Sequence, residues 1–283
     1  MFSFFKKKVD PREKLKETLM GFEMPSFSGV ILQILKQIRD PYASAADIAE
    51  KLTLDPGLSL KLMSIANSAA FSPSKKIENL TQAIPLVGIS QLESLVLGVG
   101  VAKSLPSKTC QWHDPAEFWL TAARRAMLAQ ELSKILCPEK ESECFTAAFL
   151  QDMALPILAC IRIDDYEPIF KIWHLDGGDL AGLERDVLEW DHAEVATWIC
   201  SEWEMPENIA LAIQNHHEPW VEDDPAAMGP VKLVGVLRED ESNSGLDEII
   251  KKARDDYNIP EDRMQAIIDP AFEKAREIAK MIS

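Results

Sequence analysis

Apolar residues recur every three or four positions along most of the chain, which is the period of an α-helix with one buried face. The stretch Phe27–Ile38 shows this pattern first, and Ser26 is in position to cap the helix. The Asp40-Pro41 pair that follows predicts its end, because a residue that precedes proline is pushed out of the helical region.

Polar residues mark the starts of the helices that follow. Ser, Asp and Asn cap a helix by accepting a hydrogen bond from its first turn, and proline fits the first helical position because no amide hydrogen is needed there. The predicted starts are the capping-box pairs Ser44 with Asp47, Asn79 with Gln82 and Ser90 with Glu93, and the Asp-Pro pairs Asp55-Pro56 and Asp114-Pro115. No stretch alternates as a strand would, so the sequence predicts an all-α fold.

The second half of the chain continues the helical pattern. A long helix should run from Asp114-Pro115 to Cys137-Pro138, and an apolar helix should run from Cys144 to Leu155, where Pro156 ends or kinks it. Further helices are predicted at Glu167–His174, Leu180–Glu189, His192–Trp203, Pro206–Asn215, Ala226–Leu237, Leu246–Tyr257, Glu261–Ile268 and Pro270–Ile282.

A break in the helical pattern divides the chain at Leu105–Asp114. The 283 residues are enough for two units of roughly 100–200 residues each. We therefore expect a two-lobed helical bundle. A tail and lead-in helix would occupy residues 1–20, an N-terminal helical lobe residues 21–108, and a second lobe with the C-terminal helices residues 109–283.

Charge and composition narrow the range of partners. Lys and Arg number 30 against 46 Asp and Glu, and the formal net charge of −16 argues against nucleic acid as a partner. The basic cluster Lys6-Lys7-Lys8 is too short for a stable membrane anchor. We find no secretory signal and no apolar run of membrane-spanning length, so we expect a soluble, cytoplasmic protein. Five cysteines without a C-x-x-C pair fit a reducing compartment and predict small apolar packing residues.

Three polar groups interrupt the apolar helices of the second half. Gln151-Asp152 lies inside an apolar run, where an isolated carboxylate is costly to bury without a partner. Asp191-His192 stands at a predicted helix start, and His216-His217-Glu218 stands at a predicted helix end. Taken singly, these residues also fit structural roles. Asp191 can cap a helix, and His192 can pair with a nearby carboxylate or carbonyl. His216 and His217 can be cations beside a helix C-terminus.

In their order and spacing, these groups resemble an HDOD domain, a branch of the HD phosphohydrolase superfamily. In the first lobe the resemblance rests on Met24-Pro25, Ile48-Ala49, Asp55-Pro56, Leu62, Ala66-Asn67-Ser68-Ala69, Ile77, Gln82-Ala83-Ile84, Leu86 and Gly88. In the second lobe it rests on Phe118-Trp119, Ala148–Asp152, Asp191-His192-Ala193-Glu194-Val195, Trp203, Met205-Pro206-Glu207, Ile213 and His216-His217-Glu218. The resemblance covers most of the chain and implies an HD-domain-like second lobe and a role in bacterial signalling.

The resemblance also implies that the metal site of the active HD hydrolases is degraded in this chain. Their early histidine is replaced by Thr121, the histidine of their His-Asp pair by Gln151, and their terminal aspartate would fall at Val236 or Leu237. A hydroxyl and an amide are poor metal ligands beside imidazole. We expect no metal, no cofactor and no catalytic residue. We expect a vestigial pocket that consists of Thr121, Gln151, Asp152, His192, His216, His217 and Glu218.

The leading hypothesis is a non-catalytic signal-transduction module that binds signalling protein partners in trans or a small-molecule ligand. One alternative is a metal-dependent phosphohydrolase or cyclic-dinucleotide phosphodiesterase that works with the degraded site. Another is a DNA-binding regulator, because Ser44–Ala70 has the outline of a helix-turn-helix. Lys61 is the one cation of its second helix, which is far below the density that phosphate contacts need.

Overall fold

The computed structural model describes residues 27–68, 71, 73, 75–104, 113–219, 228–238, 245–280 and 282, and every regular element within them is a helix. The first lobe contains α2 (Gly29–Ile38), α3 (Ala45–Leu52), α4 (Pro56–Ala66), α5 (Leu80–Val87) and α6 (Ile89–Ser104). The all-α prediction is confirmed. The predicted tail at residues 1–20 and most of the predicted break at Leu105–Asp114 lie outside the described residues, so the domain limits stay predictions.

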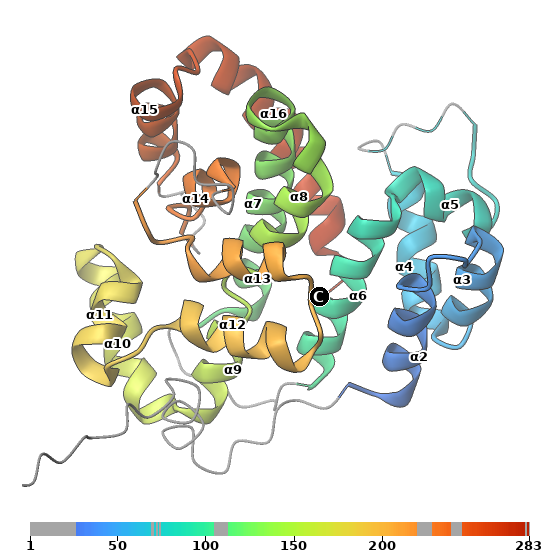
Figure 1. The fold of residues 1–283 in the computed structure, drawn as a ribbon, viewed down its shortest axis with the longest axis horizontal. Coiled ribbons are helices and arrows are strands. Elements are labelled where there is room, and N and C mark those ends of the chain that lie inside the picture. The colour runs from blue at the N-terminus through green and yellow to red at the C-terminus, as the bar shows by residue number, and fades with distance from the viewer. Residues whose placement is uncertain are drawn as a thin grey trace, which may run out of the picture.

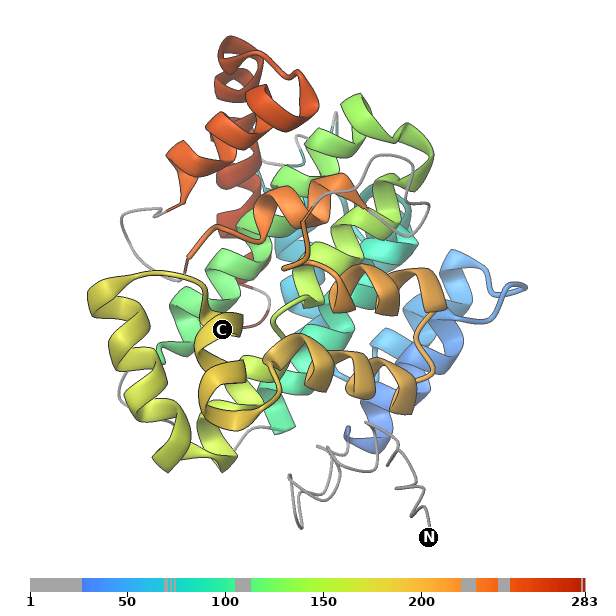
Figure 2. The same ribbon diagram turned by 60° about the vertical axis from the view of Figure 1, so that its left-hand side comes forward.

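The second lobe is built around the long helix α7. It contains α7 (Pro115–Leu136), the 3₁₀ turn η1 (Pro138–Lys140), α8 (Glu141–Leu150), α9 (Ala154–Ile161), α10 (Ile163–Asp176), α11 (Leu180–Leu188), α12 (His192–Glu202), α13 (Glu207–Gln214), α14 (Gly229–Val234), α15 (Leu246–Tyr257) and α16 (Glu261–Ala279). Helix α7 packs against α8, α14 and α16. Figure 2 shows α10 and α11 (yellow) side by side at one edge of this lobe.

Most of the predicted helix starts are confirmed. The Ser44 hydroxyl accepts the amide hydrogen of Asp47, and the Asp47 carboxylate accepts the amide hydrogen of Ser44. Asp55 and Asp114 cap α4 and α7, because their side chains accept amide hydrogens from the first turn of each helix. Each is followed by proline at the first helical position. Asn79 caps α5. The free donors at these helix ends are therefore satisfied by side chains close to them in the sequence.

Two predicted caps were wrong. Ser28 caps α2, because its hydroxyl accepts the amide hydrogen of Ile31 at 3.3 Å, whereas Ser26 lies outside the described residues. Ser90 lies inside α6, which begins at Ile89. The chain turns by 101° between α5 and α6 at the single residue Gly88, whose φ of 93° suits glycine, so a separate cap at Ser90 has no place.

Two proline predictions were also wrong. The apolar helix predicted at Cys144–Leu155 ends at Leu150, and Pro156 lies in the first turn of α9, where its missing amide hydrogen costs little. In the C-terminal region, α16 runs through Pro270 without a break, although two helices were predicted. Buried residues on both sides of Pro270 hold α16 along α7, which outweighs the loss of one helical hydrogen bond.

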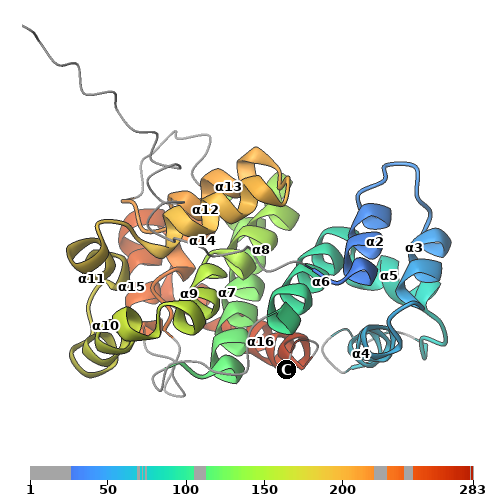
Figure 3. The ribbon, with the colours of Figure 1, turned by 90° about the horizontal axis from the view of Figure 1, so that it is seen from below.

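The two lobes meet along α6. Figures 1 and 3 show α6 between the α2–α5 group and the helices α7, α8 and α16. Across this junction the Ser94 hydroxyl donates to Thr146 at 2.9 Å. At the edge of the junction, Arg39, which directly follows α2, donates to the carbonyl oxygen of Trp203 at 3.0 Å. Phe27 packs on the Trp203 ring, with the ring centroids 4.5 Å apart. These contacts fix α2 and α6 against α8 and α12.

Among the described residues, one continuous segment, Pro138–Ile161, is long and apolar enough to cross a membrane by length and composition, with a mean hydropathy of 1.7. The sequence pattern had suggested no run of that length. However, 89% of the window is buried inside the protein, as in the core helix of a globular fold. The bent pair α5 and α6 passes the same test only as a broken span.

The close approach of α6 and α8 predicts that Gly98 cannot be enlarged. A Cβ atom at this position would lie 2.8 Å from the ring of Phe149 and 3.1 Å from Ile282. We expect Gly98→Leu to lower the free energy of unfolding in urea by about 1–3 kcal/mol, because the added atoms overpack the junction. The matched control is Gly29→Leu, since nothing lies within 4 Å of a Cβ at that exposed position. Equal stability of the two variants would contradict the packing described for α6.

Candidate functional site

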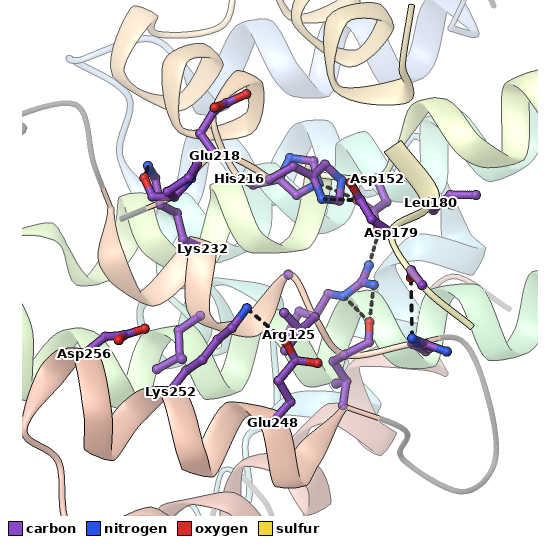
Figure 4. A pocket seen from close by; sticks show the side chains of 18 of the residues that line it. Arg125, Asp152, Asp179, Leu180, His216, Glu218, Lys232, Glu248, Lys252 and Asp256 are labelled. Atoms are coloured by element: carbon purple, nitrogen blue, oxygen red, sulfur yellow. Dashed lines mark hydrogen bonds and ion pairs between the residues drawn. The ribbon is translucent and has the colours of Figure 1, made fainter. Parts of the chain in front are cut away.

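An ion pair between Arg125 and Asp152 lies at the centre of the second lobe. Arg125 is in the middle of α7 and Asp152 is in the break between α8 and α9, and the two residues are 3% and 5% exposed. Nη1 of Arg125 donates to Oδ2 of Asp152, and Figure 4 shows the guanidinium reaching toward the site from below. Breaking a buried pair leaves an uncompensated charge, so each residue requires the other.

The other donors of Arg125 face the backbone that follows α14. Nε and Nη2 both donate to the carbonyl oxygen of Leu237, Nε at 3.0 Å. The family resemblance had placed the terminal aspartate of the HD hydrolases at Val236 or Leu237. At this position the chain supplies the backbone carbonyl of Leu237, and this oxygen accepts hydrogen bonds from the guanidinium of Arg125.

His192 connects Asp152 to a second buried carboxylate. It is the first residue of α12, directly after the cap Asp191, whose carboxylate accepts the amide hydrogen of Glu194. The Glu184 carboxylate accepts hydrogen bonds from the His192 amide at 2.9 Å and from the Tyr166 hydroxyl at 2.7 Å, and its Oε2 lies 2.6 Å from Nδ1 of His192. Glu184 thus fixes the orientation of the His192 ring from behind, through α11 and α10.

Three imidazole rings converge on Asp152. One ligand atom from each of Asp152, His192, His216 and His217 lies within 4.8 Å of the others. Nε2 of His216 is 3.1 Å from Oδ1 of Asp152, and Nε2 of His192 is 3.4 Å from the same oxygen. Nε2 of His217 is 2.8 Å from Nε2 of His192. Nδ1 of His216 lies 2.6 Å from the Ile213 carbonyl oxygen, so this nitrogen carries a proton.

The protonation of this cluster follows from its partners. Burial would raise the pKa of Asp152, but the charge of Arg125 and the contacts with His192 and His216 hold it well below its usual range. Burial would lower the pKa of His192, but the charge of Glu184 and the contact with Asp152 raise it well above its usual value. Burial and repulsion from His216 and His192 lower the pKa of His217. These shifts favour a protonated His192 beside an unprotonated His217, and the Nε2 atoms of the two rings lie 2.8 Å apart.

A metal ion does not fit this arrangement as it stands. Three imidazoles and a carboxylate are a suitable donor set for a transition metal, but an ion that binds Asp152 must compete with the Arg125 guanidinium. Arg125 already neutralises Asp152. A divalent cation would add two positive charges beside a buried guanidinium, which is costly in the protein interior.

A cavity of about 930 Å³ opens beside the cluster, and five of the seven predicted pocket residues line it. These five are Asp152, His192, His216, His217 and Glu218. Figure 4 shows α15 with Glu248, Lys252 and Asp256 on the opposite wall. Charges of both signs line the cavity, the cations being Arg125, Lys232, Arg238 and Lys252 and the acids Asp152, Asp179, Glu218, Glu248, Asp255 and Asp256.

The other two predicted pocket residues, Thr121 and Gln151, do not line this cavity. Both are fully buried. The Thr121 hydroxyl donates to the carbonyl oxygen of Arg238 at 3.4 Å, and the Gln151 side-chain amide has no hydrogen bond to a described residue. These two positions, which the family resemblance matches to metal-binding histidines of the active HD hydrolases, are therefore part of the core here.

Sequence reasoning missed three residues that hold the site together: Arg125, Glu184 and Tyr166. A signal existed for Arg125, because it follows Thr121 by four residues in a helix of mostly apolar residues and so shares the face of that position. Glu184 likewise follows Leu180 by one helical turn. A charged residue on the inward face of a helix requires a buried partner.

Comparison with known proteins identifies relatives of low sequence identity. A family model described as the HDOD domain matches residues 24–219. An uncharacterized protein of Treponema pallidum (strain Nichols) is 21% identical over 196 residues, which are 69% of this chain and only 38% of that protein. The chain therefore spans well under half the length of this relative.

Two crystal structures have a similar fold. One, from Marinobacter aquaeolei VT8, is provisionally named a signal transduction protein and is 17% identical, with a TM-score of 0.72 over 96% of this chain and 65% of that chain. The other, from Shewanella amazonensis SB2B, is provisionally named a phosphohydrolase and is 20% identical, with a TM-score of 0.68 over 96% of this chain and 97% of that chain. At these identities, the likeness shows the helical fold alone.

The buried ion pair predicts strong energetic coupling between Arg125 and Asp152. We expect Asp152→Asn alone to lower the free energy of unfolding by about 3–5 kcal/mol, because it leaves Arg125 buried without a counter-charge. The double variant Arg125→Met with Asp152→Asn should cost less than the two single substitutions together, with a coupling of about 2 kcal/mol or more in urea unfolding.

The exposed pair Glu248 and Lys252, with a 3.0 Å separation, is the matched control. Its cycle, from Glu248→Gln and Lys252→Met, should give a coupling of about 0.5 kcal/mol or less, because solvent screens it. Additive effects at Arg125 and Asp152 would show that the buried pair does not stabilise the fold.

Proposed function

The chain belongs to the HDOD domain family, and from this premise we propose that it is a non-catalytic regulatory module of a signalling system. A regulatory HD-like module is the role that the family and the likeness to a signal transduction protein support. The module binds a signalling protein partner in trans or a small-molecule ligand, and it hydrolyses no phosphate ester.

The observation that carries this proposal is the guanidinium of Arg125 on Asp152. HD hydrolases generate their nucleophile from metal-bound water, which requires a carboxylate that is free to bind the ion. In this chain the one retained carboxylate is neutralised by a side chain of the protein itself. In this proposal the site keeps the helices that carry a hydrolase centre, but its retained carboxylate is not free to bind a metal ion.

Recognition would use the cavity and the helices at its edge. Its walls carry both signs of charge, which suits a polar ligand or the charged side chains of a protein. Helices α10 and α11, which contribute Trp173 and Leu180 to the cavity, also expose Ile172, Leu175 and Val187 to solvent. In this proposal these exposed apolar residues are part of the surface that a protein partner covers. DNA binding has less support, because α4 contains Lys61 as its one cation.

A second candidate function is metal-dependent phosphoester hydrolysis. The observation in its favour is the convergence of three imidazoles on Asp152 within 4.8 Å, a spacing that suits a metal centre. Under this alternative, His192 would lose its proton and Arg125 would move away from Asp152 when a metal binds. The two candidates differ in metal content, which can be measured directly.

Metal analysis combined with a hydrolysis assay separates the two functions. We expect the purified protein, incubated with Mn²⁺ or Zn²⁺ and desalted, to retain far less than one metal ion per chain by mass spectrometry. We also expect its rate on bis(4-nitrophenyl) phosphate and on a cyclic dinucleotide to equal that of the metal ion in buffer. Arg125→Met should retain more metal than the wild type, because it removes the competing cation.

One metal ion per wild-type chain that is lost in Asp152→Ala, together with hydrolysis above the buffer rate, would establish the enzymatic alternative. A circular dichroism spectrum of each variant is the control for folding.

A further inference from the structure

Two thiols face each other where the chain turns from α7 into α8. Sγ of Cys137 is 3.8 Å from Sγ of Cys144. Cys137 is the residue that follows α7 and is half-buried, whereas Cys144 lies in α8 and is fully buried. The sequence pattern alone predicts apolar packing residues at all five cysteines. These two also contact each other, and neither of them lines the cavity beside the histidine cluster.

The backbone holds the two sulfur atoms at this separation. The amide of Cys137 donates to the Ser133 carbonyl at 2.7 Å, and the carbonyl of Cys137 accepts the amide hydrogen of Lys140 at 2.9 Å. Cys144 is fixed in the first half of α8. A disulfide requires a sulfur separation of about 2.0 Å, so the two atoms must close by about 1.8 Å from their 3.8 Å contact. Side-chain rotation can contribute to this closure without unfolding either helix.

The two thiols are chemically unequal. The hydrogen bond from Cys144 lowers the pKa of Cys137 despite partial burial, and the charge of Lys140 acts in the same direction against Glu139 and Glu143. The contact with Cys137 and burial raise the pKa of Cys144. The more accessible sulfur is therefore also the one with more thiolate character, which is the reactive form of cysteine.

We propose that Cys137 and Cys144 form a redox-active dithiol that a hydroperoxide converts into an intramolecular disulfide. The Cys137 thiolate attacks one peroxide oxygen and the O–O bond breaks, which gives a sulfenic acid and hydroxide. The Cys144 sulfur then attacks the Cys137 sulfur, the S–O bond breaks, and the leaving hydroxide takes the Cys144 proton as water. With hydrogen peroxide, two thiols and one peroxide give one disulfide and two waters.

This disulfide would link the end of α7 to α8 near their common turn. Helix α7 carries Arg125, and α8 leads directly into Asp152. Oxidation would thus link the end of α7 covalently to α8, the two helices that position Arg125 and Asp152. Neither cysteine lines the cavity. The reaction is reversed by a dithiol reductant, so the state of the pair follows the redox conditions around the protein.

Peptide mapping of the whole chain tests the proposal. The native protein is treated with hydrogen peroxide, the remaining thiols are blocked, and the digest is analysed by mass spectrometry. We expect a cross-linked peptide pair containing Cys137 and Cys144 that dithiothreitol separates. In Cys144→Ser, dimedone should label Cys137 as the trapped sulfenic acid. The control Cys200→Ser, which removes a buried cysteine elsewhere, should still form the cross-link.

Three results would overturn the proposal. Cys137 and Cys144 could remain free thiols while Cys160 is oxidised, or their cross-link could form only in urea. The third is a folded Cys144→Ser variant in which dimedone does not label Cys137. The urea result would place the reaction in the unfolded chain and not in the native turn. A circular dichroism spectrum of Cys144→Ser confirms its folding, and the oxidised wild type supplies the second measurement if this variant does not fold.

Discussion

A charge that is buried in a protein must be balanced inside it, and this requirement governs the second lobe. Arg125 and Asp152 balance each other, and His192 is balanced by Glu184 on one side and Asp152 on the other. These four residues come from α7, the α8–α9 break, α11 and α12, so their pairing requires four separate parts of the chain to be in place at once. The carbonyl of Leu237 adds the chain after α14 to the same network.

The local chemistry of the sequence predicts the helices well where the relevant atoms are close together in the chain. Ser44, Asp55 and Asp114 cap helices as predicted, because capping depends on residues two or three positions apart. Local rules failed at Pro156 and Pro270, since tertiary packing decides whether a helix tolerates a proline. The break between α8 and α9 at Gln151–Met153 could not be predicted from local sequence either, because these three residues include no glycine or proline.

The candidate site could be predicted only in part for a similar reason. Asp152, His192, His216, His217 and Glu218 were identified by their resemblance to a motif, and all five line the cavity. Arg125, Glu184 and Tyr166 belong to no motif, and their roles arise from contacts between residues far apart in sequence. The substitution at Thr121 shows that a histidine ligand is missing from α7. It does not show that Arg125, one turn further along α7, supplies a positive charge to Asp152.

The most direct test of this balance is the protonation state of the three histidines, measured from long-range ¹H–¹⁵N correlation spectra of the imidazole rings at pH 7.5. A raised pKa keeps His192 protonated above its ordinary value of about 6.5, so we predict a doubly protonated His192 beside a neutral His217. One equivalent of Zn²⁺ should leave these signals unchanged. A neutral His192, or stoichiometric shifts of the Nε2 signals of His192, His216 and His217 on addition of Zn²⁺, would contradict the closed network of protein charges.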